Sequence, residues 1–401
     1  MEDRSNVMVV LNDSVGGQLQ KAIPTKPKWV EFGRLDGRRR KLDSQSAAIE
    51  TPLAELQRAA GARMGTWFGC ALPDEFGDWR EEYRFARESV ALVDKNYRAY
   101  LEFTGPDRVR YLNAILTNNI KDLKENHGNV SLFLNPQGHI QAEIETYAMA
   151  DKLFCVSYAI IRERLVADLD KYIIMDDVTL TDQTEVYATV AMEGPKAAEV
   201  VKEVSGVDLQ ELSELESREV SVGEISCGSV KRSPGGVSGG EFLVLREQAE
   251  ALWKILAAAA RKHGGGPMGY TALNALRLEL GLPWFGYDFG EKQIPHEAGL
   301  QDSHISYTKG CYTGQEIVER VRSRGQVNRA RVALKFDTKE LPAANAPLLV
   351  EGKEFGYVTR SAFSPARNAF IGMGYVRREK AAPGEVLEVS GGTATVYGLT
   401  K

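Results

Sequence analysis

The stretch HISYTKGCYTGQEIVERVRSRG, residues 304–325, places one cysteine, Cys311, between a lysine and a tyrosine, just before an expected helix. Thr313 and Glu316 have the S/T-x-x-E spacing of a capping box and precede an apolar pair, so we expect Thr313 to be the N-cap. The free N–H groups of the first turn, together with Lys309, would then favour the thiolate form of Cys311. The alternative is that Cys311 is a small hydrophobic residue buried in a turn.

The length and the net charge of the whole chain limit the class of protein. A chain of 401 residues favours two or three domains over a single core. Lys and Arg total 50 against 55 Asp and Glu, and the resulting charge of -5 and pI near 5.8 argue against nucleic-acid or membrane partners. The N-terminus has a short apolar run among acidic residues, which fits neither a signal peptide nor a membrane span. We therefore expect a cytoplasmic protein.

Cysteine and histidine spacing argues against a metal centre held by this chain alone. The cysteines form no C-x-x-C pair and the histidines no i, i+4 pair, so neither a zinc site nor an iron–sulfur cluster is indicated. Isolated thiols fit a reducing compartment. The residues concerned are Cys70, Cys155, Cys227, Cys311, His127, His139, His263, His296 and His304.

The charge and the hydrophobic periodicity of the sequence change twice along the chain. Residues 1–49 carry a basic run, Arg34 and Arg38 to Lys41, with little apolar periodicity, which indicates a poorly ordered extension. From Thr51 strand-like and helix-like segments mix without regular alternation, so the pattern predicts an α+β fold. From about Val327 short strands are separated by Gly, Pro and Asn, which predicts a compact β-barrel or sandwich. We place the boundary near residue 326.

The segment KGCYTGQE, Lys309 to Glu316, resembles the signature of the YgfZ family of folate-binding proteins, which includes mitochondrial assembly factors of iron–sulfur enzymes. The wider chain resembles the superfamily of the glycine cleavage T-protein, an aminomethyltransferase, over about residues 50–401. The stretches that carry this resemblance are TPLAELQRAAGARM from Thr51, YLNAILTNNI from Tyr111, LRLELGLPWFGYDF from Leu276, IPHEAGL from Ile294 and GYVTRSAFSPARNAFIGMGYV from Gly356.

The resemblance implies a T-protein-like ring of three domains around a central funnel that holds tetrahydrofolate. Two intertwined α+β parts would occupy residues 50–325, and a small C-terminal β-barrel would occupy residues 326–401. The extension of residues 1–49 is left unexplained by the resemblance.

Single positions distinguish the two subgroups of this superfamily. The T-protein has aspartate where this chain has Cys311 and arginine where it has Gln315, so the motif is more similar to YgfZ. The T-protein's Asp-Asp pair, with the aspartate thought to act at the folate nitrogen, corresponds to Ala142 and Glu143 in GHIQAEI. Glu143 could transfer a proton, but a shift on the order of 1 Å can cost roughly a hundredfold in rate. The alternative is that Glu143 is an exposed strand residue.

The position of the family's pterin-gripping glutamate falls in the turn RSPGGVSGGEF. Ser238 or Gly239 stands at its place, and Glu241 becomes available only if the turn shifts. A phosphate loop is not indicated here, because the glycines precede a strand-like run and match neither nucleotide-binding pattern.

Arg277 in LRLELG is similar to the family arginine that lies beside the folate, and its guanidinium suits a carboxylate or carbonyl edge. The alternative is that it only pairs with a neighbouring acid: Glu279, Asp288 or Glu291. Taken together, the resemblance implies Cys311 and Glu143 as reacting groups. It implies folate contacts from Arg277, Lys309, Tyr312, Gln315 and Glu241.

Two functions follow from the resemblance. The first is a tetrahydrofolate-binding accessory protein that supports iron–sulfur cluster assembly or repair, with assembly factors or client enzymes as partners. The second is an aminomethyltransferase that transfers a one-carbon unit to tetrahydrofolate and needs a lipoyl carrier protein.

Overall fold

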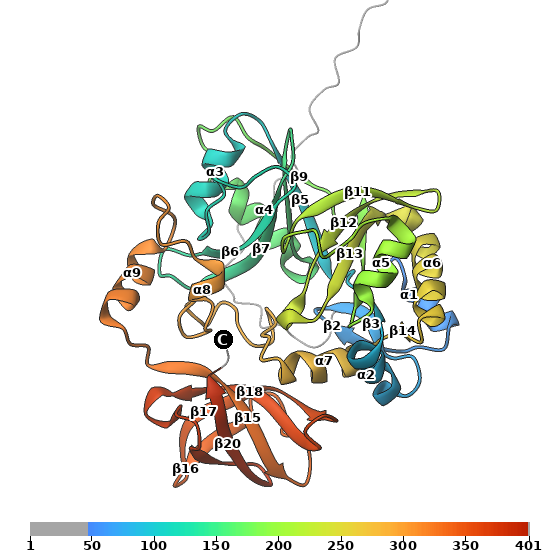
Figure 1. The fold of residues 1–401 in the computed structure, drawn as a ribbon. Coiled ribbons are helices and arrows are strands. Elements are labelled where there is room, and N and C mark those ends of the chain that lie inside the picture. Colours follow the sequence, from blue (N-terminus) through green and yellow to red (C-terminus); the bar gives the residue numbers. More distant parts are fainter. Residues whose placement is uncertain (1–46, 400–401) are drawn as a thin grey trace, which may run out of the picture. The chain divides into compact units, whose positions relative to one another are not determined.

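The computed structural model describes residues 47–399 (Figure 1). The predicted extension and its basic run, Arg34 and Arg38 to Lys41, therefore lie outside the described residues, apart from residues 47–49. The described part contains three open sheets, a closed barrel and helices packed on them, so the predicted α+β class is confirmed. Within this part of the chain, no helix has the length and apolar character needed to cross a membrane.

A six-stranded sheet forms the first layer of the fold, in the order β11-β12-β13-β10-β4-β14. Helices α5 and α6 cover it (Figure 1). The core between them includes Val190, Phe242 and Leu252. The elements are β4 (Ala91–Asp94), β10 (Tyr187–Glu193), α5 (Ala197–Ser205), β11 (Ser217–Val222), β12 (Ile225–Lys231), β13 (Gly239–Leu245), α6 (Ala249–Lys262) and β14 (Gly266–Pro267).

A five-stranded sheet forms a second layer, in the order β6-β7-β8-β5-β9. Helices α3 and α4 pack on it through a core that includes Phe103, Leu112 and Leu165. The elements are β5 (Arg98–Thr104), α3 (Arg108–Ile115), β6 (Gly128–Leu134), β7 (Ile140–Ala148), β8 (Leu153–Tyr158), α4 (Arg162–Asp170) and β9 (Thr179–Asp182).

The chain passes between these two sheets twice. Strand β4 belongs to the six-stranded sheet, β5 to β9 belong to the five-stranded sheet, and β10 returns to the first. Only residues 95–97 separate β4 from β5, so Lys95 and Arg98 lie where one sheet gives way to the other. Charged side chains at this crossing can therefore meet partners from both sheets.

A small sheet and a long helix complete the part of the fold before the barrel. The three strands have the order β1-β3-β2, and α7 packs on β3 and on α2. The elements are β1 (Ile49–Glu50), α1 (Ala54–Ala59), β2 (Arg63–Trp67), β3 (Cys70–Glu75), α2 (Trp79–Glu88), α7 (Tyr270–Glu279), α8 (Gln301–His304) and α9 (Gln315–Arg324).

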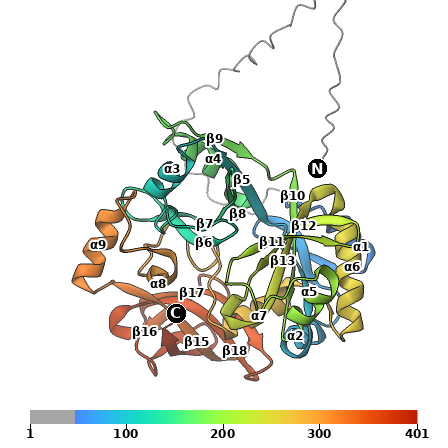
Figure 2. The same cartoon turned by 45° about the horizontal axis from the view of Figure 1, so that its top comes forward.

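The C-terminal strands close into a barrel, as predicted, in the order β15-β18-β17-β16-β19-β20 (Figure 2). Strands β17 and β18 contact α7, which brings the barrel beside the segment that carries Arg277. The strands are β15 (Arg329–Thr338), β16 (Pro347–Val350), β17 (Lys353–Ser364), β18 (Ala369–Arg377), β19 (Val386–Val389) and β20 (Gly392–Leu399).

The predicted capping box at the start of α9 is wrong. The N-cap is Gly314, with a φ of 82° and no side-chain cap, and the helix begins at Gln315. A side chain at residue 314 would meet the carbonyl oxygen of Asn135, because a Cβ there would lie 2.7 Å from it. Close approach to the β6–β7 turn, rather than a Thr313 cap, therefore sets this helix start.

Candidate functional site

Glu143 lies in β7 and is held by two side chains that are distant in sequence. The hydroxyl of Tyr158 donates to Glu143 Oε2 at 2.6 Å, and His304 Nε2 lies 3.0 Å from Oε1. The Glu143 side chain retains 19 % exposure, so solvent or a ligand can reach it. Burial and the adjacent Glu143 carboxylate raise the pKa of Tyr158 well above its usual value, which keeps the phenol protonated as a donor. The structure thus places an oriented, accessible carboxylate here.

His304 links Glu143 to the segment that precedes Cys311. Its other ring nitrogen, Nδ1, lies 2.7 Å from the Ser303 hydroxyl, which is exposed. The His304 carbonyl oxygen accepts from Thr117 Oγ1 at 2.6 Å and fixes the backbone. Ser303, His304 and Glu143 therefore form a hydrogen-bonded chain from solvent to the carboxylate, which is a possible route for a proton.

Charged side chains at the crossing between the two sheets form a paired-charge network, with three cations facing three carboxylates. Arg98 donates two hydrogen bonds, of 2.5 and 2.9 Å, to the Glu241 carboxylate, and both side chains are at most 10 % exposed. The other pairs are Arg232–Glu145 at 2.8 Å and Lys95–Glu193 at 2.7 Å.

The pKa values in this network follow from the pairing. Burial alone would raise the pKa of the Glu145 carboxyl, but Arg232 and Arg98 outweigh it and hold that pKa below its usual value. Burial opposes the charge of Arg98 as well, and Glu241 and Glu145 reverse this and raise its pKa. Glu145 and Arg98 are therefore expected to stay charged at neutral pH.

Glu241, a predicted folate contact, belongs to this network. It lies in β13, and both of its oxygens accept from Arg98. The turn before it is a connection between β12 and β13, as the sequence indicated. Arg98 therefore takes one acceptor site on each oxygen of Glu241.

Arg277 pairs with Asp288, one of the three acids that the sequence left open. Both residues are almost fully buried, at 2 % and 1 % exposure. Arg277 also donates to Asn274 Oδ1 at 2.9 Å and to the Leu282 carbonyl oxygen at 3.1 Å. Burial lowers the pKa of Arg277, Asp288 opposes the shift, and nearby Arg360 adds to it.

A group of aromatic rings in mutual contact extends from Glu143 to Arg277. Phe68 is its centre, with ring centroids 5.6 Å from Tyr158, 5.2 Å from Trp284 and 4.9 Å from Tyr287. Five of the rings are only partly buried, as is common for Trp and Tyr, and these five offer an accessible edge or face. The group consists of Trp67, Phe68, Tyr97, Tyr158, Tyr270, Trp284, Phe285 and Tyr287.

The motif residues around Cys311 take up separate positions. Lys309 Nζ donates to three backbone carbonyls at 2.5 to 2.9 Å: those of Asn113, Leu116 and Asn118, at the C-terminal end of α3. Burial lowers the pKa of Lys309 to about 8. Tyr312 is 7 % exposed, and its N–H donates to Gln315 Oε1 at 3.3 Å. Lys309 and Gln315 thus both make contacts within the protein.

Cys311 is exposed, whereas the other three cysteines are buried. Burial raises the pKa of Cys70 and of Cys155 to about 12, and that of Cys227 to about 11. The alternative of a buried Cys311 is therefore wrong. Its reactivity stays a prediction.

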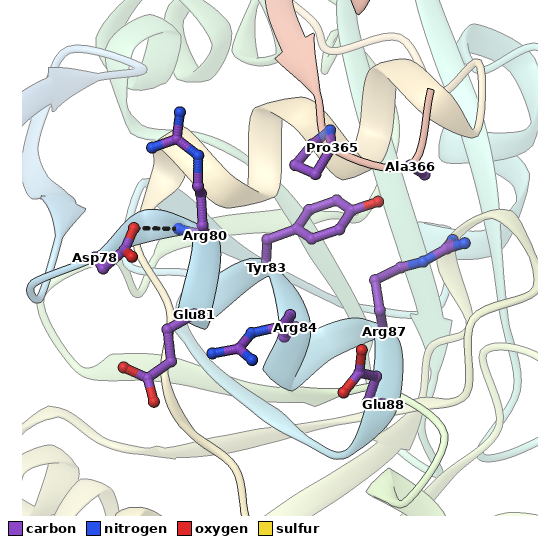
Figure 3. Close-up of a pocket in the computed structure, with 9 residues that line it drawn as sticks. All are labelled: Asp78, Arg80, Glu81, Tyr83, Arg84, Arg87, Glu88, Pro365 and Ala366. Atoms are coloured by element: carbon purple, nitrogen blue, oxygen red, sulfur yellow. Dashed lines mark hydrogen bonds between the residues drawn. The ribbon is translucent and has the colours of Figure 1, made fainter. Parts of the chain in front are cut away.

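A depression of about 460 Å³ lies away from these residues, on α2 and the turn after β17 (Figure 3). Its rim alternates arginines with acids, and none of the predicted site residues line it. We therefore place the candidate site at Glu143 and the aromatic group. The lining residues are Asp78, Arg80, Glu81, Tyr83, Arg84, Arg87, Glu88, Pro365 and Ala366.

Comparison with known families supports the fold assignment. Residues 53–304 match the GCVT N-terminal domain, and residues 329–396 match the glycine cleavage T-protein C-terminal barrel domain. The chain belongs to the glycine cleavage T-protein family.

Named relatives and a solved structure agree with this membership. An aminomethyltransferase of Desulfitobacterium hafniense strain Y51 is 26 % identical over 340 residues, which cover 84 % of this chain and 93 % of the relative. One of Rubrobacter xylanophilus is 28 % identical over 337 residues, covering 84 % and 89 %. The glycine cleavage system aminomethyltransferase T of Bartonella henselae has a TM-score of 0.79 at 24 % identity, covers 88 % of this chain and 97 % of its own, and supports the fold.

Sequence reasoning missed several residues of this T-protein-family site. Tyr158 and His304 hold Glu143 but lie 15 and 161 positions away, and neither belongs to a motif around it. Arg98 carried no signal beyond its place at the start of a strand. The repeated aromatic residues in GTWFG and LPWFGYDF offered a signal, since clustered half-buried rings often mark ligand sites.

Proposed function

We propose that this protein binds tetrahydrofolate and works as a one-carbon transferase of the aminomethyltransferase type, with Glu143 as the proton-transferring group. The observation that supports it is the Glu143 carboxylate, which is partly exposed and oriented by Tyr158 and His304. The relatives named aminomethyltransferase support the same reaction class.

The residues beside Glu143 fit a flat, partly reduced heterocycle joined to an aromatic acid. Partly exposed rings of Tyr97, Tyr158, Trp284 and Tyr287 offer stacking surfaces. Arg277 Nη2 is buried without a hydrogen-bond partner among residues 47–399, so a donor is left for a ligand acceptor.

In the proposed reaction, tetrahydrofolate supplies the nitrogen that accepts the one-carbon unit from the aminomethyl carrier. Glu143 accepts the proton that this nitrogen loses as the first N–C bond forms and passes it to the departing amine, so that ammonia leaves as the C–N bond of the aminomethyl group breaks. A second folate nitrogen then forms the other N–C bond as the C–S bond to the carrier breaks, and its proton goes to the released thiolate. The hydrogen bond from Tyr158 holds the Glu143 carboxylate in its orientation. His304 and Ser303 connect it to solvent.

The test is an assay with an aminomethylated lipoyl carrier protein and tetrahydrofolate, in which ammonia and methylene-tetrahydrofolate are measured together. Glu143→Gln should lower kcat by about 100-fold or more, because general acid–base catalysis contributes roughly that much. Tetrahydrofolate binding should persist in the variant. The matched control is Glu163→Gln, at an exposed position of α4. A wild-type protein that binds tetrahydrofolate but releases no ammonia would contradict the transferase proposal.

A second candidate is the accessory function for iron–sulfur enzymes, with assembly factors or client enzymes as partners. The observation that favours it is Cys311, the exposed cysteine among four, on a loop that packs against the β6–β7 turn through Gly314. Cys311→Ser should then lose complementation of a cluster-dependent enzyme in a deletion strain, while Thr313→Ala on the same loop should complement. Full complementation by Cys311→Ser, together with slow alkylation of Cys311 by iodoacetamide, would reject this candidate.

A further inference from the structure

Thr117, just after α3, has a fully buried side chain that bonds two backbone segments at once. Its Oγ1 donates to the His304 carbonyl oxygen at 2.6 Å and accepts from the Leu132 N–H at 2.8 Å. Its exposed fraction is 0 %. A hydroxyl has one proton to donate and lone pairs to accept, so Thr117 uses both capacities here. One hydroxyl therefore joins the backbone at residue 304 to the backbone at residue 132.

The two joined segments each lead to one partner of the carboxylate–imidazole pair. Leu132 in β6 is the register partner of Glu143 in β7. His304 is the last residue of α8, which packs beside β6 (Figure 1). Its ring Nε2 lies 3.0 Å from Glu143 Oε1. The approach of the imidazole to the carboxylate therefore depends on how the backbone at His304 is fixed to β6.

Further hydrogen bonds repeat the connection that the Thr117 hydroxyl makes. The Thr117 N–H donates to the Leu132 carbonyl oxygen at 3.1 Å, and the Ser306 N–H donates to the Thr117 carbonyl oxygen at 3.0 Å. Lys309 Nζ donates to the carbonyl oxygens of the two residues that flank Thr117. Residues 116–118 thus lie as a bridge between the segment 304–309 and β6.

The hydroxyl of Thr117, rather than its volume, is what this bridge uses. Valine at this position would fill nearly the same space but would leave the His304 carbonyl and the Leu132 N–H without this partner in a buried place. The backbone at His304 would then shift toward other donors. A displacement on the order of 1 Å at a reacting group can cost roughly a hundredfold in rate.

We propose that Thr117 is a positioning residue, whose hydroxyl holds His304 at hydrogen-bond distance from Glu143. The inference rests on the proposed function, in which Glu143 transfers the proton. It adds a residue that contacts neither the carboxylate nor the ligand and acts through the backbone of His304.

The first arm of the test compares Thr117→Val with Thr117→Ser in the one-carbon transfer assay. Thr117→Val should lower kcat by about 10- to 100-fold, because the proton-transferring pair is displaced. The KM for tetrahydrofolate should stay unchanged, since the Thr117 side chain is fully buried. Thr117→Ser keeps the hydroxyl and should retain the wild-type kcat.

The second arm does not depend on activity and uses nuclear magnetic resonance of protein labelled with ¹⁵N-histidine. The chain has five histidines, and the signals of His304 are those lost in His304→Gln. Glu143→Ala gives the reference spectrum for a broken pair. Thr117→Val should move the His304 Nε2 resonance toward this reference, and Thr117→Ser should leave it in place.

The matched control is Thr146→Val, at a second fully buried threonine, in the same strand as Glu143. Its hydroxyl lies 3.5 Å from the Cys155 sulfur and has no bond to the bridge. Thr146→Val should therefore change neither kcat nor the His304 resonance.

Unchanged His304 signals in Thr117→Val would overturn the inference, whatever happens to kcat. Equal loss of kcat in Thr117→Val and Thr117→Ser would overturn it too, because packing would then be responsible. Displaced His304 signals in Thr117→Val, in a protein whose wild type transfers no one-carbon unit, would support the positioning of His304 and reject the proposed function. If Thr117→Val does not fold, Thr117→Cys gives the same test, because a thiol is a weak donor.

Discussion

Around Arg98, three cations face three carboxylates, whereas Arg277 pairs with the carboxylate of Asp288 and lies close enough to the guanidiniums of Arg331 and Arg360 to be influenced by their charge. Both regions are largely buried, and both bring together residues that lie far apart in sequence. In the paired-charge network each of the six charges has an oppositely charged neighbour. Around Arg277, by contrast, Nη2 of Arg277 and Nε of Arg360 have no hydrogen-bond partner among residues 47–399.

The difference teaches how to separate scaffold from site. A balanced network satisfies itself and holds two sheets together, so removal of one member leaves its partner unpaired. Where guanidiniums outnumber carboxylates, as around Arg277, removal of Arg360 leaves no carboxylate of residues 47–399 unpaired and should cost the fold less. Four variants test this contrast.

The largest effect is expected for Glu241→Gln. The variant leaves Arg98 buried without a carboxylate, and breaking a buried ion pair in this way typically costs about 3–5 kcal/mol. Urea unfolding should show a free energy of unfolding lower by this amount.

Its control is Glu55→Gln, which breaks the exposed pair with Arg58 and should cost less than about 1 kcal/mol. If both variants lose the same stability, the network around Arg98 is not a closed structural unit.

Asp94 extends the comparison to a buried anion without a cation among residues 47–399. It is fully buried, and burial raises its pKa to about 6, although Asn96, Gln57 and Thr51 oppose the shift by donating to it. The folded protein therefore keeps the Asp94 proton between about pH 4 and 6, where the unfolded chain has released it. Relative to Asp94→Asn, the wild type should lose roughly 3 kcal/mol of stability as the pH rises through this window.

The measurement is the difference in free energy of unfolding between wild type and Asp94→Asn, taken at half-unit steps from pH 4 to 7.5. The difference should change below pH 6 and level off above it. A constant difference would mean that the hydrogen bonds to Asp94 fully offset its burial.

Lys309 is a third kind of buried cation, held by backbone carbonyls alone. Lys309→Met removes the donor to Asn113, Leu116 and Asn118 and should cost about 1–3 kcal/mol, measured in the same urea series. Lys171→Met, at an exposed lysine, should cost less than about 1 kcal/mol.

Tetrahydrofolate titration of Lys309→Met then distinguishes the two roles of this residue. Lower stability with unchanged affinity assigns Lys309 to the scaffold. A large loss of affinity at unchanged stability would instead support the folate contact that the resemblance implied.

The smallest effect is expected for Thr313→Ala. Loss of a true N-cap would cost about 1 kcal/mol, but the Thr313 side chain makes no cap hydrogen bond, because the N-cap is Gly314 and the helix begins at Gln315. The free energy of unfolding should therefore fall by less than about 0.5 kcal/mol. A fall of about 1 kcal/mol in the free energy of unfolding would instead support the predicted Thr313 cap.

Local pattern was sufficient for much of the fold. Strand-like runs such as AYLEFTG and VYATVAMEG, and the Gly-punctuated segments after residue 326, became strands because apolar and β-branched spacing acts over a few residues. The helix start at Gln315 was misread because the contact between Gly314 and Asn135 joins residues 179 positions apart.

By itself the sequence determined the α+β class, the C-terminal barrel and, through its family motifs, where Glu143, Arg277 and Cys311 stand in the chain. The fold alone brings Glu143 to Tyr158 and His304, pairs Arg98 with Glu241, and leaves Arg360 without a carboxylate partner among residues 47–399. The reason is the sequence separation over which each kind of interaction acts. Backbone propensity and hydrophobic periodicity are read from neighbours in sequence, whereas the state of a buried charge depends on which partners the fold brings within about 4 Å.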